Sequence, residues 1–261
     1  MGLRARFMSR LVARSERLGR SSTAAVPARG LSRLRVVHRN LGPAVNFVPS
    51  RRWQPGSNVD VLLVQGFATG PLTLDVLARA LTEEFELDCC VPRLGGMLGY
   101  LQTREVRHSG QQLAELLHSL PSNQRPWLVG HSMGGIIARD AVQRGGAADK
   151  VAGVVTLGSP HRGTPVALAG LLLGLGLISR APRQMLPWAR AVRDLNALPW
   201  PAELPITAIV SSSDVLCPPW FGSLPFADGC RFVNQGFAGH GHTELVRSQE
   251  IAAYVGRLIT S

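Results

Sequence analysis

The chain has 261 residues, 45% of them hydrophobic, and a formal net charge of +11. This length suffices for one large α/β domain with a substantial core, and no run of about 18 apolar residues indicates a membrane-spanning helix. Twelve arginines and one acidic residue, Glu16, lie in residues 1–52. The excess positive charge therefore belongs to that segment, and the basic and acidic residues of 53–261 are equal in number. The basic composition therefore does not indicate a nucleic-acid-binding domain, and we expect no nucleic acid partner.

Residues 1–52 have the pattern of a basic amphipathic extension. Leu3, Phe7 and Leu11 share one helical face, and most of the arginines lie on the other. The segment is compatible with peripheral contact to an anionic membrane, with a transit-type presequence, or with a disordered extension. It has no uninterrupted apolar core of about 7–15 residues, as a secretory signal would. We expect a cytoplasmic or peripheral membrane protein whose domain is residues 53–261.

The body of the chain alternates between strand and helix patterns. Val61–Val64 is a continuous apolar run, typical of a strand buried on both faces, whereas Leu74, Leu77 and Leu81 repeat at helical spacing. This alternation predicts an α/β fold with a doubly wound, mostly parallel sheet, whose reactive groups gather beyond the carboxyl ends of the strands. Strands are predicted at 61–64, 87–91, 126–129, 151–157, 206–210 and 231–233, more weakly at 34–37 and 44–48, and helices at 72–85, 104–120, 136–142 and 243–259.

A G-x-S-x-G motif follows the predicted strand 126–129 and precedes the predicted helix 136–142. It reads Gly130-His131-Ser132-Met133-Gly134. A serine on such a strand–turn–helix junction is held in a sharp turn, and its neighbours two residues away must be small. The sequence therefore predicts that Ser132 is a nucleophile with an exposed hydroxyl.

A serine hydroxyl needs a base to take its proton, and the base needs an acid that orients it. The loop Phe237–Thr243 offers His242 and His240, and we favour His242 because it directly precedes the last helix. Asp214 follows the strand 206–210 and fits the chain order Ser, Asp, His, with Asp228 as the alternative.

The remaining site residues are expected near the nucleophile. The main-chain N–H groups of Phe67 and Met133 are the expected oxyanion donors, because one follows the first strand and the other begins the helix after Ser132. Gln65, His131 and Leu172 are the expected substrate contacts.

The four cysteines do not form a metal-binding pattern. Cys89 and Cys90 are adjacent, so in a strand they point to opposite faces, whereas Cys217 and Cys230 flank one loop and could bridge it. Free buried thiols are the expectation without a secretory signal. Because no C-x-x-C pair or histidine cluster occurs, we expect no metal and no cofactor.

With these motifs together, the chain resembles the α/β-hydrolase superfamily, and within it bacterial triacylglycerol lipases and related esterases. The segments Leu157–Pro165 and Gly241–Val246 are similar to the lipase segments after the next strand and around the catalytic histidine. The resemblance covers residues 59–259 and implies a helical lid or cap at about residues 166–204 and a sheet reduced to about six strands.

The resemblance also carries expectations for single residues. His161, within the segment Leu157–Pro165, is structural in that family. Gln65-Gly66 stands where these lipases usually have His-Gly, so the anchoring of the oxyanion loop differs here.

The sequence favours a serine hydrolase that cleaves carboxylic esters, of lipid type, through an acyl-enzyme. An acyltransferase on the same fold and a non-catalytic module that binds a membrane surface or a partner remain alternatives.

Overall fold

The computed structural model describes residues 39–40, 58–94, 96, 102–172, 177, 179–225 and 229–261. Within these ranges the strands form one sheet of six, in the order β2-β1-β3-β4-β5-β6, and all neighbouring strands are parallel. The predicted α/β class and the reduced sheet are confirmed. The strands are β1 (Val61–Val64), β2 (Cys89–Cys90), β3 (Trp127–His131), β4 (Gly153–Leu157), β5 (Ile206–Ser211) and β6 (Phe232–Phe237).

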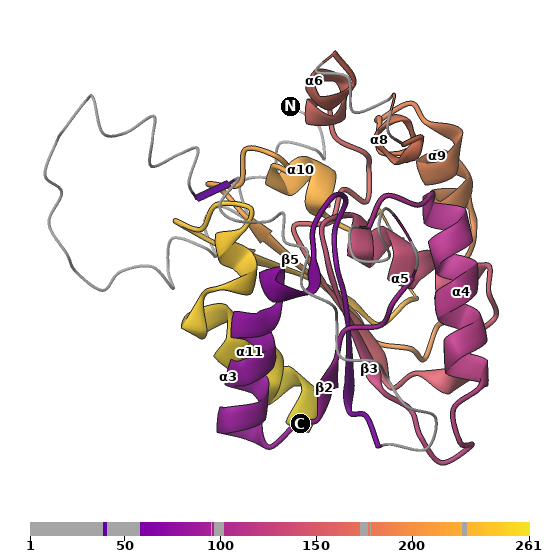
Figure 1. The fold of residues 1–261 in the computed structure, drawn as a ribbon, viewed down its shortest axis with the longest axis vertical. Helices are drawn as coiled ribbons and strands as arrows, with labels where there is room; N and C mark the ends of the chain where they lie inside the picture. The colour runs from indigo at the N-terminus through magenta and orange to yellow at the C-terminus, as the bar shows by residue number, and fades with distance from the viewer. Residues whose placement is uncertain are drawn as a thin grey trace, which may run out of the picture.

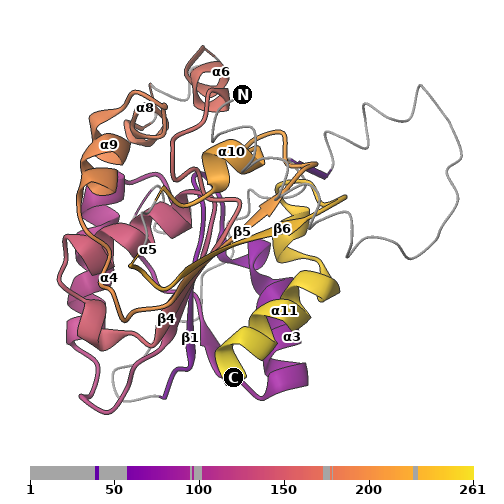
Figure 2. The ribbon, with the colours of Figure 1, turned by 180° about the vertical axis from the view of Figure 1, so that it is seen from behind.

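Helices cover both faces of the sheet (Figures 1 and 2). On one face lie α3 (Asp75–Phe85) and α11 (Gln249–Thr260), and on the other α4 (Val106–His118) and α5 (Met133–Gln143). Alternate side chains of β1 feed the two cores: Val61 and Leu63 pack on the α3 side, whereas Leu62 and Val64 pack on the α4 side. Burial on both faces explains why the strands are continuous apolar runs.

Short helices gather beyond one end of the sheet (Figures 1 and 2). Between β4 and β5 the chain forms α6 (Val166–Leu172), α8 (Ala181–Gln184) and α9 (Arg190–Ala197), and after β5 it forms α10 (Pro219–Gly222). The first three lie in the interval where we expected a lid. Three short 3₁₀ turns complete the described elements: η1 (Pro71–Thr73), η2 (Ala148–Lys150) and η3 (Glu244–Val246).

Two predicted helices are divided in the structure. The first consists of η1 and α3, because Leu74 lies between them and precedes the first residue of α3, Asp75. The last consists of η3 and α11, and the side chain of Ser248 caps α11 by accepting the N–H of Ile251 at 3.4 Å. A side-chain cap marks a helix start more firmly than the apolar periodicity that runs through it.

The predicted strand at 87–91 is shorter than expected, since only Cys89–Cys90 pairs, and it pairs with β1 alone at the edge of the sheet. The weaker strand candidates at 34–37 and 44–48 lie outside the described residues, as does nearly all of 1–52. Within the described ranges, no helix has both the length and the apolar character to cross a bilayer.

The four cysteines are free thiols in the structure, so Cys217 and Cys230 do not bridge their loop. Burial raises the pKa of the Cys89 thiol to about 12 and that of Cys217 well above its usual value. Such thiols stay protonated and unreactive near neutral pH.

Candidate active site

Ser132 lies in a strained turn between β3 and α5. Its φ of 54° and ψ of −125° place a non-glycine residue in a region that L side chains rarely adopt. A β-carbon at Gly134 would lie 2.0 Å from the carbonyl oxygen of Val64, and one at Gly130 would lie 2.5 Å from the main chain of Gly135. Only glycine allows so close an approach, so the motif is required for the turn.

The loop after β1 packs directly against this turn. A β-carbon at Gly66 would lie 2.9 Å from that of Ser132. The hydroxyl of Thr69 donates to the carbonyl of Gly66 at 2.9 Å, and the N–H of Ala68 donates to the carbonyl of Gln102 at 2.7 Å. The loop that carries Phe67 is therefore anchored by Thr69 and by the main chain of Gln102.

Asp214 and His242 form a buried hydrogen-bonded pair. Asp214 Oδ2 accepts from His242 Nδ1 at 2.7 Å. The other oxygen, Oδ1, accepts the N–H groups of Leu216 and Cys217 at 2.9 and 2.8 Å. Both oxygens of this carboxylate are thus occupied, and the ring orientation of His242 is fixed by the pair.

Ser132 and His242 line one cavity of about 410 Å³ at the carboxyl ends of β1, β3, β4, β5 and β6. This volume lies in the usual range for small-molecule sites. Its lining is mainly apolar and includes Phe67, Ala68, Pro160, Val166, Ala167, Gly170, Pro182, Met185, Leu216 and Cys217, together with the polar residues Asn40, Thr69, His131, Thr164 and Thr243.

The other expected site residues are placed differently. Phe67 and His131 line the cavity, and Met133 is the buried first residue of α5. Gln65 is buried and Leu172 is 81% exposed, and neither belongs to the lining that the structure describes.

His240, the alternative base, is not among the residues that line this cavity. Nε2 of His240 lies 2.9 Å from the Ser248 hydroxyl, and the ring lines a separate polar hollow with Arg39 and Arg247. Asp228 lies outside the described residues. The placement therefore favours His242 over His240.

His131, which ends β3 and directly precedes Ser132, contacts the loop after β6 that carries His242. Its Nε2 lies 3.1 Å from the main-chain oxygen of His242, and because a carbonyl only accepts, Nε2 carries the proton and donates. Burial, and secondarily the charge of His242, lowers the pKa of His131 to about 3. His131 is therefore neutral at ordinary pH.

Buried polar residues also link β4 to the helix after the nucleophile. His161 lies 2.9 Å from the Thr156 hydroxyl and 3.4 Å from Nη1 of Arg139 in α5. Burial, with the charges of Arg139 and Arg162, lowers the pKa of His161 well below its ordinary value. These contacts fit the structural role expected for His161.

Comparison with known proteins identifies the fold that carries this cavity. Residues 101–176 match the family described as PGAP1-like alpha/beta domain. The mature lipase BlEst2 of Bacillus licheniformis is similar in structure, with a TM-score of 0.63, 15% identity, and 80% of this chain and 95% of that chain covered. The chain has the α/β-hydrolase fold.

Further solved structures share this α/β-hydrolase fold. The monoacylglycerol lipase of Paleococcus ferrophilus has a TM-score of 0.58 and 15% identity, covering 81% of this chain and 98% of its own. The type II thioesterase BorB, from the borrelidin biosynthetic cluster, has a TM-score of 0.57 and 19% identity, covering 83% and 98%. No protein with a curated description matches the sequence.

The site of this α/β-hydrolase fold includes residues that sequence reasoning missed. Gln102 anchors the loop after β1 through its main chain, and Asn40 lines the cavity although it precedes the expected domain start at residue 53. Neither lies in a motif, since both act through contacts with distant segments. No pattern in the sequence marks them.

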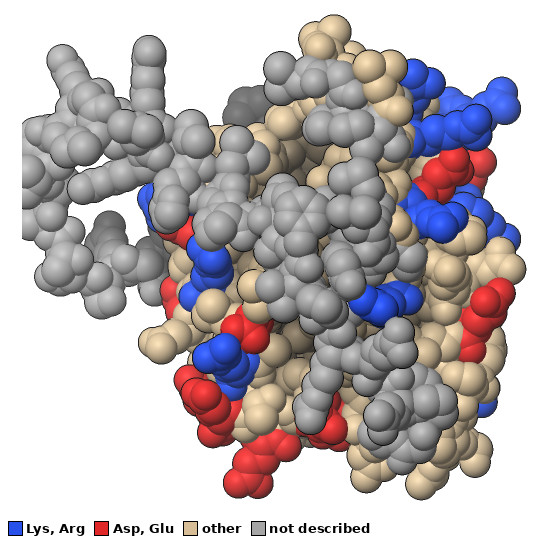
Figure 3. Space-filling view, in the orientation of Figure 1, with Lys and Arg blue, Asp and Glu red and all other residues tan. Residues whose placement is uncertain are grey.

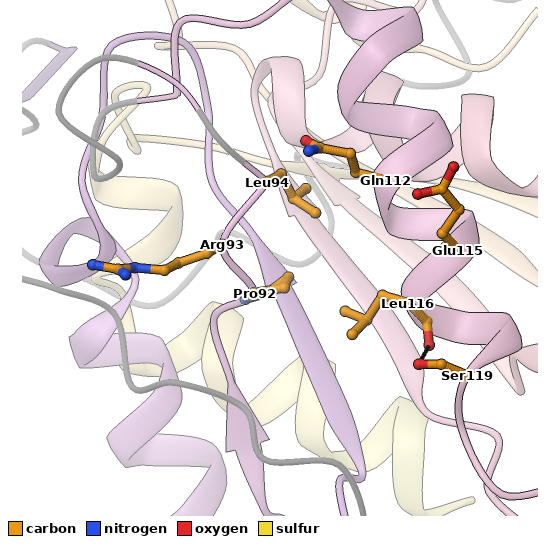
Figure 4. A pocket seen from close by; sticks show the side chains of 7 residues that line it. All are labelled: Pro92, Arg93, Leu94, Gln112, Glu115, Leu116 and Ser119. Carbon is orange, nitrogen blue, oxygen red and sulfur yellow. Dashed lines mark hydrogen bonds between the residues drawn. The ribbon is translucent and has the colours of Figure 1, made fainter.

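A second hollow of about 410 Å³ lies between the residues after β2 and α4 (Figure 4). Its lining comprises Pro92, Arg93, Leu94, Gln112, Glu115, Leu116 and Ser119, and the Ser119 hydroxyl donates to the Leu116 carbonyl at 2.7 Å. No histidine lies beside this serine in the lining. The first cavity, in contrast, is lined by a serine and a histidine together, Ser132 and His242.

Proposed function

We propose that this protein is a serine hydrolase that cleaves carboxylic esters. The observation that carries the proposal is the 2.7 Å bond between Asp214 and His242, with His242 and the strained Ser132 lining one mainly apolar cavity. Neighbours with the same fold are described as lipases and a thioesterase, which supports cleavage of ester-type bonds.

In the proposed reaction the hydroxyl of Ser132 attacks the ester carbonyl while His242 Nε2 takes its proton. Asp214 holds Nδ1 and stabilises the imidazolium. The bond to the leaving oxygen then breaks, and that oxygen receives the proton from Nε2. Water attacks the acyl-enzyme with the same proton transfer, which releases the acid and restores Ser132.

The oxyanion is proposed to bind the main-chain N–H groups of Phe67 and Met133. Support comes from the packing of the Gly66 loop on Ser132 and from the position of Met133 at the N-terminus of α5. Because these donors are main-chain groups, Gln65 in place of histidine leaves the chemistry intact. Loss of one such donor costs about 10²–10³ in rate.

A lipid-type substrate is proposed from the lining and from the lid interval. α6 contributes Val166, Ala167 and Gly170 to the apolar cavity. Leu172, the last residue of α6, and Leu177 are 81% and 91% exposed, and the described surface at the tip over α6 is uncharged in Figure 3, with basic residues to one side. We propose that 166–204 acts as an acyl-binding lid.

The test is hydrolysis of p-nitrophenyl esters of increasing acyl length by the parent and by Ser132→Ala. We expect turnover to disappear in Ser132→Ala, because no nucleophile remains, while its thermal unfolding stays like that of the parent. Equal rates for the two proteins would refute the proposal. A parent that cleaves only the shortest esters would refute the lipid-type substrate alone.

Two alternatives have distinct outcomes in the same assay. An acyltransferase would transfer the acyl group to an added alcohol in preference to water, which product analysis detects. A folded parent that neither turns over esters nor reacts with a fluorophosphonate at Ser132 would be a non-catalytic binding module.

Peripheral membrane contact through residues 1–52 is a separate proposal, supported by their twelve arginines and single acid. Replacing Arg4, Arg6 and Arg10 with glutamate should weaken sedimentation with vesicles of anionic lipid. Unchanged sedimentation would exclude this segment as the anchor.

A further inference from the structure

One side-chain oxygen, that of Asn40, binds both the loop after β5, which carries Asp214, and the loop after β6, which carries His242. Oδ1 of Asn40 accepts the N–H of His242 at 2.9 Å and the N–H of Val215 at 3.1 Å. Val215 directly follows Asp214. A single acceptor therefore bridges the main chains of the two loops whose side chains form the Asp214–His242 pair.

Asn40 is held firmly in this position. It is only 3% exposed, and the carbonyl of the preceding residue, Arg39, accepts the N–H and the hydroxyl of Thr243 at 3.2 and 2.9 Å. Nε of Arg39 also pairs with Glu244 at 2.7 Å. A β-carbon at Gly241 would lie 2.5 Å from the Arg39 carbonyl, so glycine is needed for this close contact.

The main chain of His242 is held on both sides. Asn40 accepts its N–H, and the buried neutral ring of His131 donates to its carbonyl at 3.1 Å. Both partners are side chains from distant parts of the sequence. The imidazole is thus oriented by Asp214 while its backbone is fixed independently.

We propose that Asn40 is a positioning residue for the catalytic pair, an inference that rests on the proposed hydrolase function. A buried N–H without an acceptor is costly, so removing Oδ1 makes both loops move until they find other partners. Small displacements of reacting groups cost up to about 100-fold in rate. Asn40 then acts on the reaction through the placement of His242, without contacting the ester.

The experiment compares kcat and KM for the parent, Asn40→Leu, Asn40→Asp and a matched control, Asn234→Leu. Asn234 also uses its Oδ1 to accept a main-chain N–H, that of Leu224 at 2.8 Å, but it does not line the cavity. We expect kcat to fall about 10- to 100-fold in Asn40→Leu with KM nearly unchanged. Asn234→Leu should lower the Tm and keep the kcat of the parent.

Asn40→Asp keeps an acceptor oxygen at the same reach and should return kcat to within about threefold of the parent. If Asn40→Leu does not fold, Asn40→Ser replaces it, because that hydroxyl is too short to reach both N–H groups. The inference is overturned if Asn40→Leu or Asn40→Ser has the kcat of the parent. It is also overturned if Asn40→Asp folds but its kcat is as low as that of the leucine or serine variant.

The proposed function fails in a distinguishable way. In that case the parent itself shows no esterase turnover and no fluorophosphonate adduct at Ser132. An active parent with an equally active Asn40→Leu refutes the positioning role alone.

Discussion

Two sides of the cavity are held in place differently: the nucleophile side, which carries Ser132, and the acid–histidine side, which carries Asp214 and His242. Ser132 is fixed by main chain: β3 leads into the turn, α5 leads out, and the Ser132 N–H donates to the Leu157 carbonyl at the end of β4 at 2.8 Å. Close backbone packing at Gly130 and Gly134 leaves no room for another geometry. This side is built almost entirely from main chain.

His242 is held mainly by side chains from separate segments. Asp214 binds its ring, and Asn40 and His131 bind its main chain. A short motif therefore suffices to recognise the nucleophile, whose position the backbone around the motif determines. It does not suffice for the base, whose position depends on side chains from distant segments. The difference between the two sides also predicts how each responds to substitution.

The largest expected effect is on the acid–histidine side. Asp214→Asn keeps an oxygen for the N–H groups of Leu216 and Cys217 but cannot hold the required tautomer of His242. We expect kcat/KM for a p-nitrophenyl ester to fall about 10⁴-fold, with the Tm nearly unchanged. A variant within tenfold of the parent would remove Asp214 from its proposed role.

On the nucleophile side, Gly134→Ala should lower the free energy of unfolding by roughly 3 kcal/mol, since its β-carbon meets the Val64 carbonyl and the backbone must shift. Urea denaturation measures the change. The control is Gly146→Ala, where φ is +69° but nothing lies within 4 Å, so strain alone costs about 1 kcal/mol. Equal losses in the two variants would show that the turn tolerates a β-carbon.

The smallest effect concerns pH and the His131 contact. Because the pKa of His131 is about 3 in the folded protein and about 6.5 when unfolded, the unfolded state binds the extra proton between these values. The effect of His131 protonation on the free energy of unfolding is therefore absent above about pH 6.5, and below it this group lowers stability by about 1.4 kcal/mol per pH unit.

His131→Asn should remove the pH-dependent part of the stability that His131 contributes. The urea midpoint of this variant should therefore change less between pH 7 and pH 5 than the midpoint of the parent. The buried His161 remains in both proteins and leaves a common residual slope. Parallel midpoint curves would mean that His131 has the same pKa in the folded and the unfolded protein, contrary to this expectation.

Much of the fold could be predicted because its signals are local. The apolar run Val61–Val64 and the glycines around Ser132 indicated their strand and turn correctly. Helix starts were less accurate, since the Ser248 cap, and not the apolar periodicity, marks where α11 begins.

The surroundings of the candidate site were harder to predict. Asn40 is 202 residues from His242, and Gln102 acts through its main-chain carbonyl, so neither has a sequence signal. Leu172 is an expected substrate contact, but it is exposed at the end of α6 and is not among the residues that line the cavity. Contacts between distant segments are decided by packing, which periodicity and motifs do not encode.

Whether Ser132 is the nucleophile and His242 its base is tested by reaction with a fluorophosphonate followed by peptide mapping, in the parent and in His242→Ala. We expect a single adduct on Ser132 in the parent, and a labelling rate at least about 10³-fold lower in His242→Ala because the hydroxyl has lost its base. An adduct on another serine, or equal labelling rates in the two proteins, would contradict these roles.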